Sequence, residues 1–253
     1  MAPSTVPAAE LSHLPKADGS ATFSYRGYSV IAAVNGPVEA QRRDENAFEA
    51  LVDVIVRPAA GVGASSVGTR ERQLESFLQA ALRQLIPVRN FPRCVIQITL
   101  QVVETPDNAY VNAKLVQASL NLPIIPALLH AAILAILTAA IPLKAIAAAT
   151  VIAISDDNTN FIIDPTAVEA DRARALHVLG FTSQDELLVS ESEGSFSADE
   201  WIKVLELGQR ICSQHRPTGM DTVMAGDNYE SQSMKEFIRL VVEAKTAEDL
   251  HWK

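Results

Sequence analysis

Hydrophobic and polar residues alternate in several short segments of the chain, which is the pattern of half-buried β-strands. Residues 17–40 predict a hairpin of two short strands, with a turn at Gly27 and an end at Gly36-Pro37. In its second strand one face carries Val30, Ala32 and Val34. The same alternation, in which successive side chains point to opposite faces, predicts further strands at 51–58 and 93–104.

Two segments have the longer spacing of helices. Between residues 74 and 85 the apolar residues form one stripe, and Pro87 follows as a stop signal. Residues 123–142 are almost entirely apolar, but Pro126, His130 and Thr138 interrupt them. Because a membrane span needs about 20 uninterrupted apolar residues, this segment predicts a buried helix from about Ala127 to Ile141 instead.

The second half of the chain alternates strand and helix signals. We predict paired strands at residues 145–155 and 160–165, joined by an Asp/Asn turn, and another strand at residues 186–194. The segment 173–181 fits a strand or a helix equally well. Ser197-x-x-Glu200 and Ser233-x-x-Glu236 have the spacing of capping boxes that open helices. We interpret residues 105–122 and 216–232 as loops and the first ten residues as frayed, which gives an α+β fold of sheets covered by helices.

Composition narrows the classes of function. The chain has 253 residues, 48% of them hydrophobic, and two cysteines, Cys94 and Cys212, which indicates a reducing compartment and no disulfide framework. The N-terminus lacks the basic start and apolar run of a signal peptide. We therefore expect neither secretion nor a membrane association.

The net charge of −9 is unevenly distributed. Residues 1–93 hold ten Lys/Arg against nine Asp/Glu, so the excess of acidic residues lies in the remainder. Such a chain should not bind nucleic acid tightly on its own, because affinity scales with the phosphates neutralised. A local arginine face and ordinary solvated charges both remain open as explanations of the early arginines. These are Arg26, Arg42, Arg43, Arg57, Arg70, Arg72, Arg83, Arg89 and Arg93.

Few local patterns carry chemistry. The Gly/Ser-rich loop before residue 70 lacks the third glycine of a dinucleotide loop and the Gly-Lys-Ser/Thr of a P-loop. Asp156, Asp157 and Asp164 form a carboxylate cluster that could bind Mg²⁺ or act as paired acids, although their positions also suit turn residues. None of the histidines has metal-ligand spacing, and His130 is expected to be a hydrogen-bonded core group. No cofactor is predicted.

The serial order of several motifs resembles the RNase PH family over about residues 15–215. The motifs are Asp18-Gly19-Ser20-Ala21, Gly36-Pro37, "VRPAAGVG", "TRERQLESFLQAAL", Pro92-Arg93, "LHAAILAILTAAIPLK" and Ile163-Asp164-Pro165-Thr166. Within the family they look most like the small RNase PH-like ring subunit of the eukaryotic RNA exosome, which has no appended RNA-binding domains. The resemblance implies two related sheet-and-helix units at 15–145 and 146–217, with a linker and helix at 218–253. It also implies that the opening motifs are scaffold.

The resemblance further implies that two positions lack the charged side chains that active members of the family use. Phosphorolytic members bind phosphate with a Gly-Thr/Ser-Arg motif before the central helix, and here Ile125 occupies the place of that arginine. Gly68-Thr69-Arg70 matches the motif but precedes the first helix. The acid expected about a dozen residues after Asp164 falls on Leu176, although Asp171 is close enough to keep that alignment open.

The resemblance also implies which residues would bind RNA. Active members use arginines at the start of the first long helix to hold the RNA backbone, which corresponds here to Arg70 and Arg72. Arg93 matches the family's arginine before a strand, where its role could also be structural. The resemblance thus predicts a catalytically inert subunit of the exosome ring, which helps to form a channel for single-stranded RNA in RNA processing and degradation.

Two alternatives stay open: an active phosphorolytic 3′→5′ exoribonuclease, and a metal-dependent nuclease that uses Asp156, Asp157 and Asp164. The exosome resemblance also implies partners and a location. The partners would be the other RNase PH-like ring subunits, the cap subunits, associated nucleases and single-stranded RNA. The location would be the nucleus, nucleolus and cytoplasm.

Overall fold

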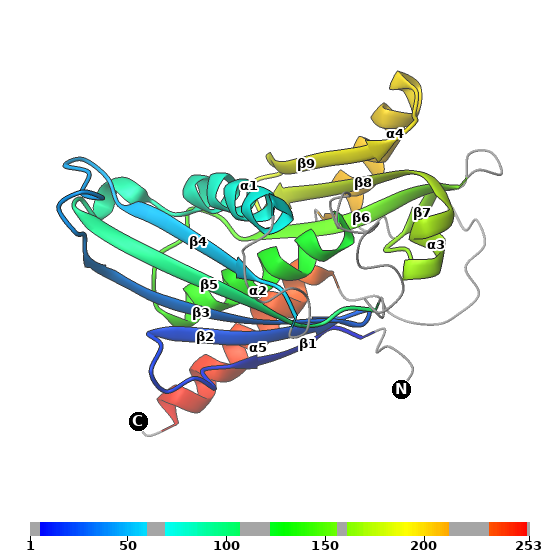
Figure 1. Ribbon diagram of the computed structural model, residues 1–253. Coiled ribbons are helices and arrows are strands. Elements are labelled where there is room, and N and C mark those ends of the chain that lie inside the picture. The colour runs from blue at the N-terminus through cyan, green and yellow to red at the C-terminus, as the bar shows by residue number, and fades with distance from the viewer. Residues whose placement is uncertain (1–5, 60–68, 107–121, 156–160, 213–232, 252–253) are drawn as a thin grey trace.

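The computed structural model consists of two β-sheets with helices between and around them (Figure 1). It describes residues 6–59, 69–106, 122–155, 161–212 and 233–251. The predicted loop at 216–232, most of the loop at 105–122, Gly68, Asp156 and Asp157 lie outside these residues. The observed α+β architecture agrees with the predicted fold class.

The first sheet has five strands in the order β1-β2-β3-β5-β4. Their bounds are β1 Ala8–Leu11, β2 Gly19–Tyr25, β3 Tyr28–Glu39, β4 Leu51–Arg57 and β5 Cys94–Glu104. Only β4 and β5 pair in parallel. The predicted faces are confirmed, because the alternate residues of β3, β4 and β5 are buried. The apolar stripe of α1 (Thr69–Leu85) packs on β4, and the short 3₁₀ turn η1 (Val88–Asn90) follows it.

The second sheet has the order β7-β6-β8-β9 and is fully antiparallel. Its strands are β6 Ala147–Ser155, β7 Phe161–Ile163, β8 Ala173–Thr182 and β9 Leu187–Gly194. The ambiguous segment 173–181 is therefore a strand, paired on both sides by β6 and β9. The sheet carries α4 (Ala198–Cys212) on one face, where Trp201 and Val204 pack into a second core cluster.

Helix α2 (Ile125–Thr138) lies between the two sheets and contacts β2, β3 and β6 (Figure 1). Its residues from Ile125 to Ile136 are all buried, which explains why the segment is so apolar. The helix begins two residues earlier than predicted, because Pro126 sits in its first turn, where a missing N–H costs nothing. None of the described helices is long and apolar enough to cross a membrane.

The opening hairpin is confirmed, but its predicted end is wrong. Strand β3 continues through Gly36-Pro37 by a shift in register between Asn35 and Val38. The Gly36 N–H donates a hydrogen bond of 2.8 Å to Asp18 Oδ2. At Gly19 a side chain would clash, since a Cβ there would lie 2.3 Å from the Ala135 carbonyl oxygen of α2. The opening motifs thus hold the first sheet against the central helix, as expected of scaffold.

Two further parts of the sequence interpretation need correction, and one is confirmed. Residues 8–11, expected to be frayed, form strand β1 through pairing with β2. A short helix, α3 (Ala167–Arg172), was not predicted, although its capping box between Thr166 and Glu169 was readable in the sequence. The predicted Ser197–Glu200 capping box is confirmed by hydrogen bonds in both directions.

Helix α5 (Met234–Leu250) begins at the predicted place, but the Ser233 side chain caps nothing. Apolar packing holds this helix instead. Ile238 is fully buried, Phe237 meets the ring of Phe23 edge-on at 6.3 Å, and Lys235 Nζ donates to the Thr182 carbonyl at 3.1 Å. Tertiary contacts with both sheets therefore fix α5 in place.

Candidate functional site

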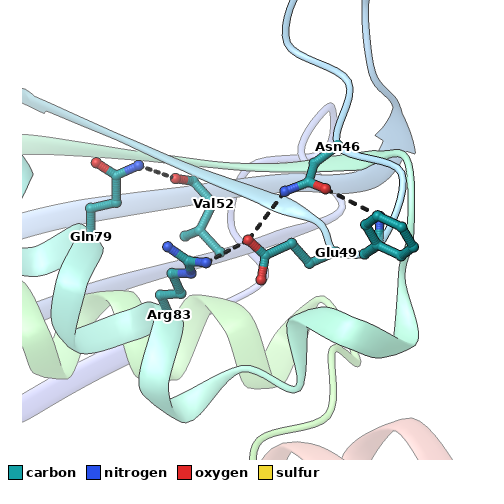
Figure 2. A network of polar contacts seen from close by, with 6 residues as sticks. Asn46, Glu49, Val52, Gln79 and Arg83 are labelled. Carbon is teal, nitrogen blue, oxygen red and sulfur yellow. Dashed lines mark hydrogen bonds and ion pairs between the residues drawn. The ribbon is translucent and has the colours of Figure 1, made fainter.

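The predicted RNA-binding arginines lie at opposite ends of α1. This helix runs antiparallel to β4, as three contacts show: Glu75 with the Val56 N–H (2.9 Å), Gln79 with the Val52 carbonyl (2.7 Å), and Arg83 with Glu49 (2.5 Å; Figure 2). Arg70 and Arg72 are in the first turn, next to the ends of β4 and β5, and the side chain of Arg72 is exposed.

Arg93, by contrast, directly precedes β5. Since a helix of this length spans about 25 Å, Arg93 is not part of the same local group as Arg70 and Arg72. It has a positive φ of 61°, and its backbone N–H donates to the Asn46 carbonyl at 3.0 Å. Its carbonyl accepts from the Ala40 N–H at 2.9 Å, and its exposed guanidinium forms an ion pair of 3.2 Å with Glu45. These contacts hold the loop between β3 and β4, which gives Arg93 a structural role.

A cationic group that the sequence did not single out lies at the C-terminal end of α1. Arg83, Arg89 and Lys144 line one hollow, together with Glu49. Figure 2 shows Glu49, which accepts hydrogen bonds from both Arg83 and Asn46. The arginines were visible in the sequence, but their grouping with Lys144 was not. Lys144 is distant along the chain and is brought in by a bond from its N–H to the Leu85 carbonyl of 2.8 Å.

The position that the resemblance assigns to the family's phosphate-binding arginine is apolar and buried. Ile125, the first residue of α2, has no exposed surface. Leu176 lies in β8, opposite Ala153 and Glu193, and packs against the core. Asp171, the nearby acid, is exposed in α3. The sequence Thr69-Arg70 opens α1, so it does not supply the phosphate motif of α2.

Asp164 serves as an acceptor that joins the two sheets. Its carboxylate accepts from the Tyr25 hydroxyl on β2 at 3.0 Å, from the Thr150 hydroxyl on β6 at 3.0 Å and from the Val151 N–H at 3.2 Å. Burial, followed by the neighbouring Asp164 charge, raises the pKa of Tyr25, so the phenol stays protonated as the donor. Among the described residues no group of three acidic, His or Cys side chains could hold a metal ion, and Asp156 and Asp157 lie outside them.

His130 is a hydrogen-bonded residue of the core, as predicted from the apolar segment around it. Its Nε2 accepts from the Ala149 N–H at 3.0 Å, and its ring meets Phe23 edge-on. Desolvation lowers the pKa of His130 to about 3, so the imidazole is neutral and the proton is on Nδ1. The residue ties α2 to β6.

Comparison with known proteins agrees with this architecture. Residues 8–142 match domain 1 of the 3′ exoribonuclease family, RNase PH, and residues 144–211 match domain 2. The chain therefore belongs to the RNase PH family of α+β proteins. It is 34% identical over 212 residues to the exosome complex component RRP46 of Saccharomyces cerevisiae, which covers 81% of this chain and 90% of that protein. It is 25% identical over 240 residues to the Schizosaccharomyces pombe exosome complex component rrp46, covering 91% and 97% of the two chains.

Solved structures share the fold. The crystal structure of rice Rrp46 matches with a TM-score of 0.67 and 24% identity over 79% of this chain and 86% of that one. A chain of the Archaeoglobus fulgidus exosome with RNA bound to the active site matches with a TM-score of 0.64 and 12% identity over 81% and 84%. At these identities the likeness establishes the fold.

Proposed function

We propose that this protein is a non-catalytic ring subunit of an RNA exosome, which supports 3′→5′ RNA processing and degradation by helping to form the RNA-threading channel. The proposal rests on membership of the RNase PH family and on similarity to RRP46 proteins named as exosome components. The observation that carries the inert role is Ile125, fully buried at the place of the phosphate-binding arginine. An isoleucine side chain offers no donor or charge to an anion.

Two other features support inertness. Leu176 gives an apolar side chain where the family has an acid, and it packs within the sheet. Asp164 already accepts three hydrogen bonds from the protein, so its carboxylate is committed to structure. The function left to the chain is to assemble with other RNase PH-like ring subunits, cap subunits and associated nucleases, in the nucleus, nucleolus and cytoplasm.

Contact with RNA would come from Arg70 and Arg72 at the start of α1. Arginine side chains bind phosphate oxygens through paired N–H donors and read no base sequence. Arg93 is the weaker candidate, because Glu45 already partners its guanidinium and it lies at the other end of α1.

A phosphorolysis assay tests the inert role. Purified protein with inorganic phosphate and single-stranded RNA should release no nucleoside diphosphates, alone or with the single change Ile125→Arg. One restored arginine should not suffice, since catalytic groups act as a unit and Leu176 also departs from the pattern. An active RNase PH-family enzyme under the same conditions is the positive control. Release of diphosphates by the wild-type chain would contradict the proposal.

The ring role has its own test, which is co-purification. The chain should form a stable complex with RNase PH-like partner subunits, whereas alone it should self-associate through the faces that the ring would cover. Light scattering that shows a well-behaved monomer, together with no partner binding, would contradict the ring assignment.

A further inference from the structure

A hollow of about 700 Å³ lies at the C-terminal end of α1, at the opposite end of the helix from Arg70 and Arg72. Four segments meet there: the end of α1, the turn that follows it, the end of the loop between β3 and β4, and the segment after α2. The volume is within the range of ligand sites. The charged residues that line the hollow are Glu49, Arg83, Arg89 and Lys144.

The lining has an excess of positive charge. Arg83, Arg89 and Lys144 contribute cations, and Glu49 is the one carboxylate among the lining residues. Glu49 is already engaged by Arg83 at 2.5 Å and by the Asn46 amide at 3.2 Å. Within the part of the chain that the structure describes, neither Arg89 nor Lys144 forms an ion pair, and both side chains are exposed. Arg89 and Lys144 are thus two cations, in a chain of net charge −9, that line the hollow and pair with no acidic side chain of the described residues.

Backbone hydrogen bonds preform the walls of the hollow. The Lys144 N–H donates to the Leu85 carbonyl at 2.8 Å, and the Ala50 N–H donates to the Val88 carbonyl at 2.9 Å. The Asn90 N–H donates to the Pro87 carbonyl at 2.9 Å. A site whose backbone is already fixed loses little entropy on binding, so a few charge contacts suffice for measurable affinity.

We propose that this hollow binds phosphate groups of single-stranded RNA through Arg89 and Lys144, with Arg83 held in place by Glu49. This inference rests on the proposed function in an RNA-threading ring. An arginine fork and a lysine ammonium suit phosphate oxygens. Arg83, Arg89 and Lys144 supply the charged donors of the hollow, and such donors suit the repeated phosphates of RNA. Binding of an acidic protein segment at the same place is an outcome that the test distinguishes.

The position of the hollow extends the RNA path. Arg70 and Arg72 lie at one end of α1 and the hollow at the other, about 25 Å apart by the length of the helix. A stacked single strand has one phosphate per roughly 3.4 Å, so about seven phosphates would span the two groups. Both groups can then contact one RNA strand that runs along α1.

The test is the double variant Arg89→Glu/Lys144→Glu in the full chain, assembled with its RNase PH-like partner subunits. The matched control is Lys203→Glu/Arg210→Glu on the exposed face of α4, which changes the net charge equally. Binding of fluorescent oligouridylate and oligoadenylate is measured over a range of salt concentrations. We expect the Arg89/Lys144 variant to bind both RNAs at least about fivefold more weakly, and the control to bind as wild type. The slope of log affinity against log salt should fall by about 1.4, since each lost phosphate contact removes about 0.7.

The outcomes separate this inference from the proposed function. If Arg70→Glu/Arg72→Glu weakens RNA binding but Arg89→Glu/Lys144→Glu does not, the inference about the hollow fails and the ring role stands. If the Arg89/Lys144 variant loses a partner subunit with unchanged RNA affinity, the hollow is a protein interface and the inference is wrong. If the wild-type ring binds no RNA, both fail. The milder variant Arg89→Gln/Lys144→Gln removes the same two cations without reversing their charge, so it should also lower the slope by about 1.4 and keeps the test valid if charge reversal disturbs folding.

Discussion

Replacing Asp164 by alanine should strongly destabilise the folded chain. The substitution removes an acceptor from three donors that lie on both sheets: the Tyr25 hydroxyl, the Thr150 hydroxyl and the Val151 N–H. Thr150 and Val151 are buried, at 3% and 5% exposure, so both donors lose their acceptor inside the protein. Each orphaned buried donor costs about 1–3 kcal/mol. Residue 164 also has a φ of 48°, a conformation that alanine adopts at a cost of about 1–2 kcal/mol.

The expected total is about 4 kcal/mol of unfolding free energy, because Tyr25 is only half-buried and can turn to solvent. For a chain of this size that is a fall in Tm of about 8–16 °C. Asp164→Asn is the informative partner variant. Thr150 and Val151 both use Oδ1, which the amide retains, and asparagine tolerates a positive φ. It should therefore cost only about 1 kcal/mol.

The assay is thermal and urea unfolding followed by circular dichroism, with Asp171→Ala in exposed α3 as the control. That control should change the unfolding free energy by less than about 0.5 kcal/mol. A loss below about 1 kcal/mol for Asp164→Ala, or equal losses for the alanine and asparagine variants, would refute the structural role of this carboxylate. Asp164 would then be free for other chemistry, including the metal site considered from the sequence.

Three further outcomes follow from other parts of the molecule. Gly19→Ala should cost several kcal/mol in urea unfolding, since its Cβ would lie 2.3 Å from the Ala135 carbonyl, whereas a tolerated alanine would show that α2 can shift. Burial of neutral His130 should make the folded chain less stable in acid. The pKa of His130 is about 3 in the folded chain and about 6.5 in the unfolded chain, so below pH 6.5 only the unfolded state takes up the proton. The free energy of unfolding should therefore fall by about 1.4 kcal/mol per pH unit in this range. His130→Gln should make the loss of stability between pH 6 and pH 4 shallower, and an unchanged slope would contradict a buried neutral imidazole. Arg70→Glu/Arg72→Glu should weaken RNA binding by the assembled ring equally for different RNA sequences, and a base-dependent loss in filter binding would contradict phosphate contact.

Much of the fold was predictable because it depends on local pattern. Alternating residues defined β3, β4 and β5, and the stripe from Leu74 to Leu85 defined α1. These patterns predict the elements correctly because one face of each strand or helix must be buried, whichever elements it packs against. The same holds for the Ser197–Glu200 capping box, which is complete within four residues.

Other elements depended on partners distant in the sequence. Residues 8–11 are a strand only because β2 provides its edge, and 173–181 are a strand because β6 and β9 flank them. Ser233 had the local signature of a helix cap, but its side chain makes no capping bond. Tertiary packing decided the position of α5 instead, through the contact of Phe237 with Phe23 and the burial of Ile238. Propensity is a weak prior where tertiary pairing contributes more free energy.

The candidate site divides in the same way. The sequence by itself determined which residues are present: arginines at 70, 72 and 93, and an isoleucine at 125, the position to which the resemblance assigns a phosphate-binding arginine. Only the tertiary structure decided where they lie relative to one another. It separated Arg93 from Arg70 and Arg72 by the length of α1, brought Lys144 beside Arg83 and Arg89, and used Asp164 to join two sheets. The physical reason is that side-chain chemistry is fixed by each residue alone, whereas proximity is set by packing between segments that are far apart in the chain.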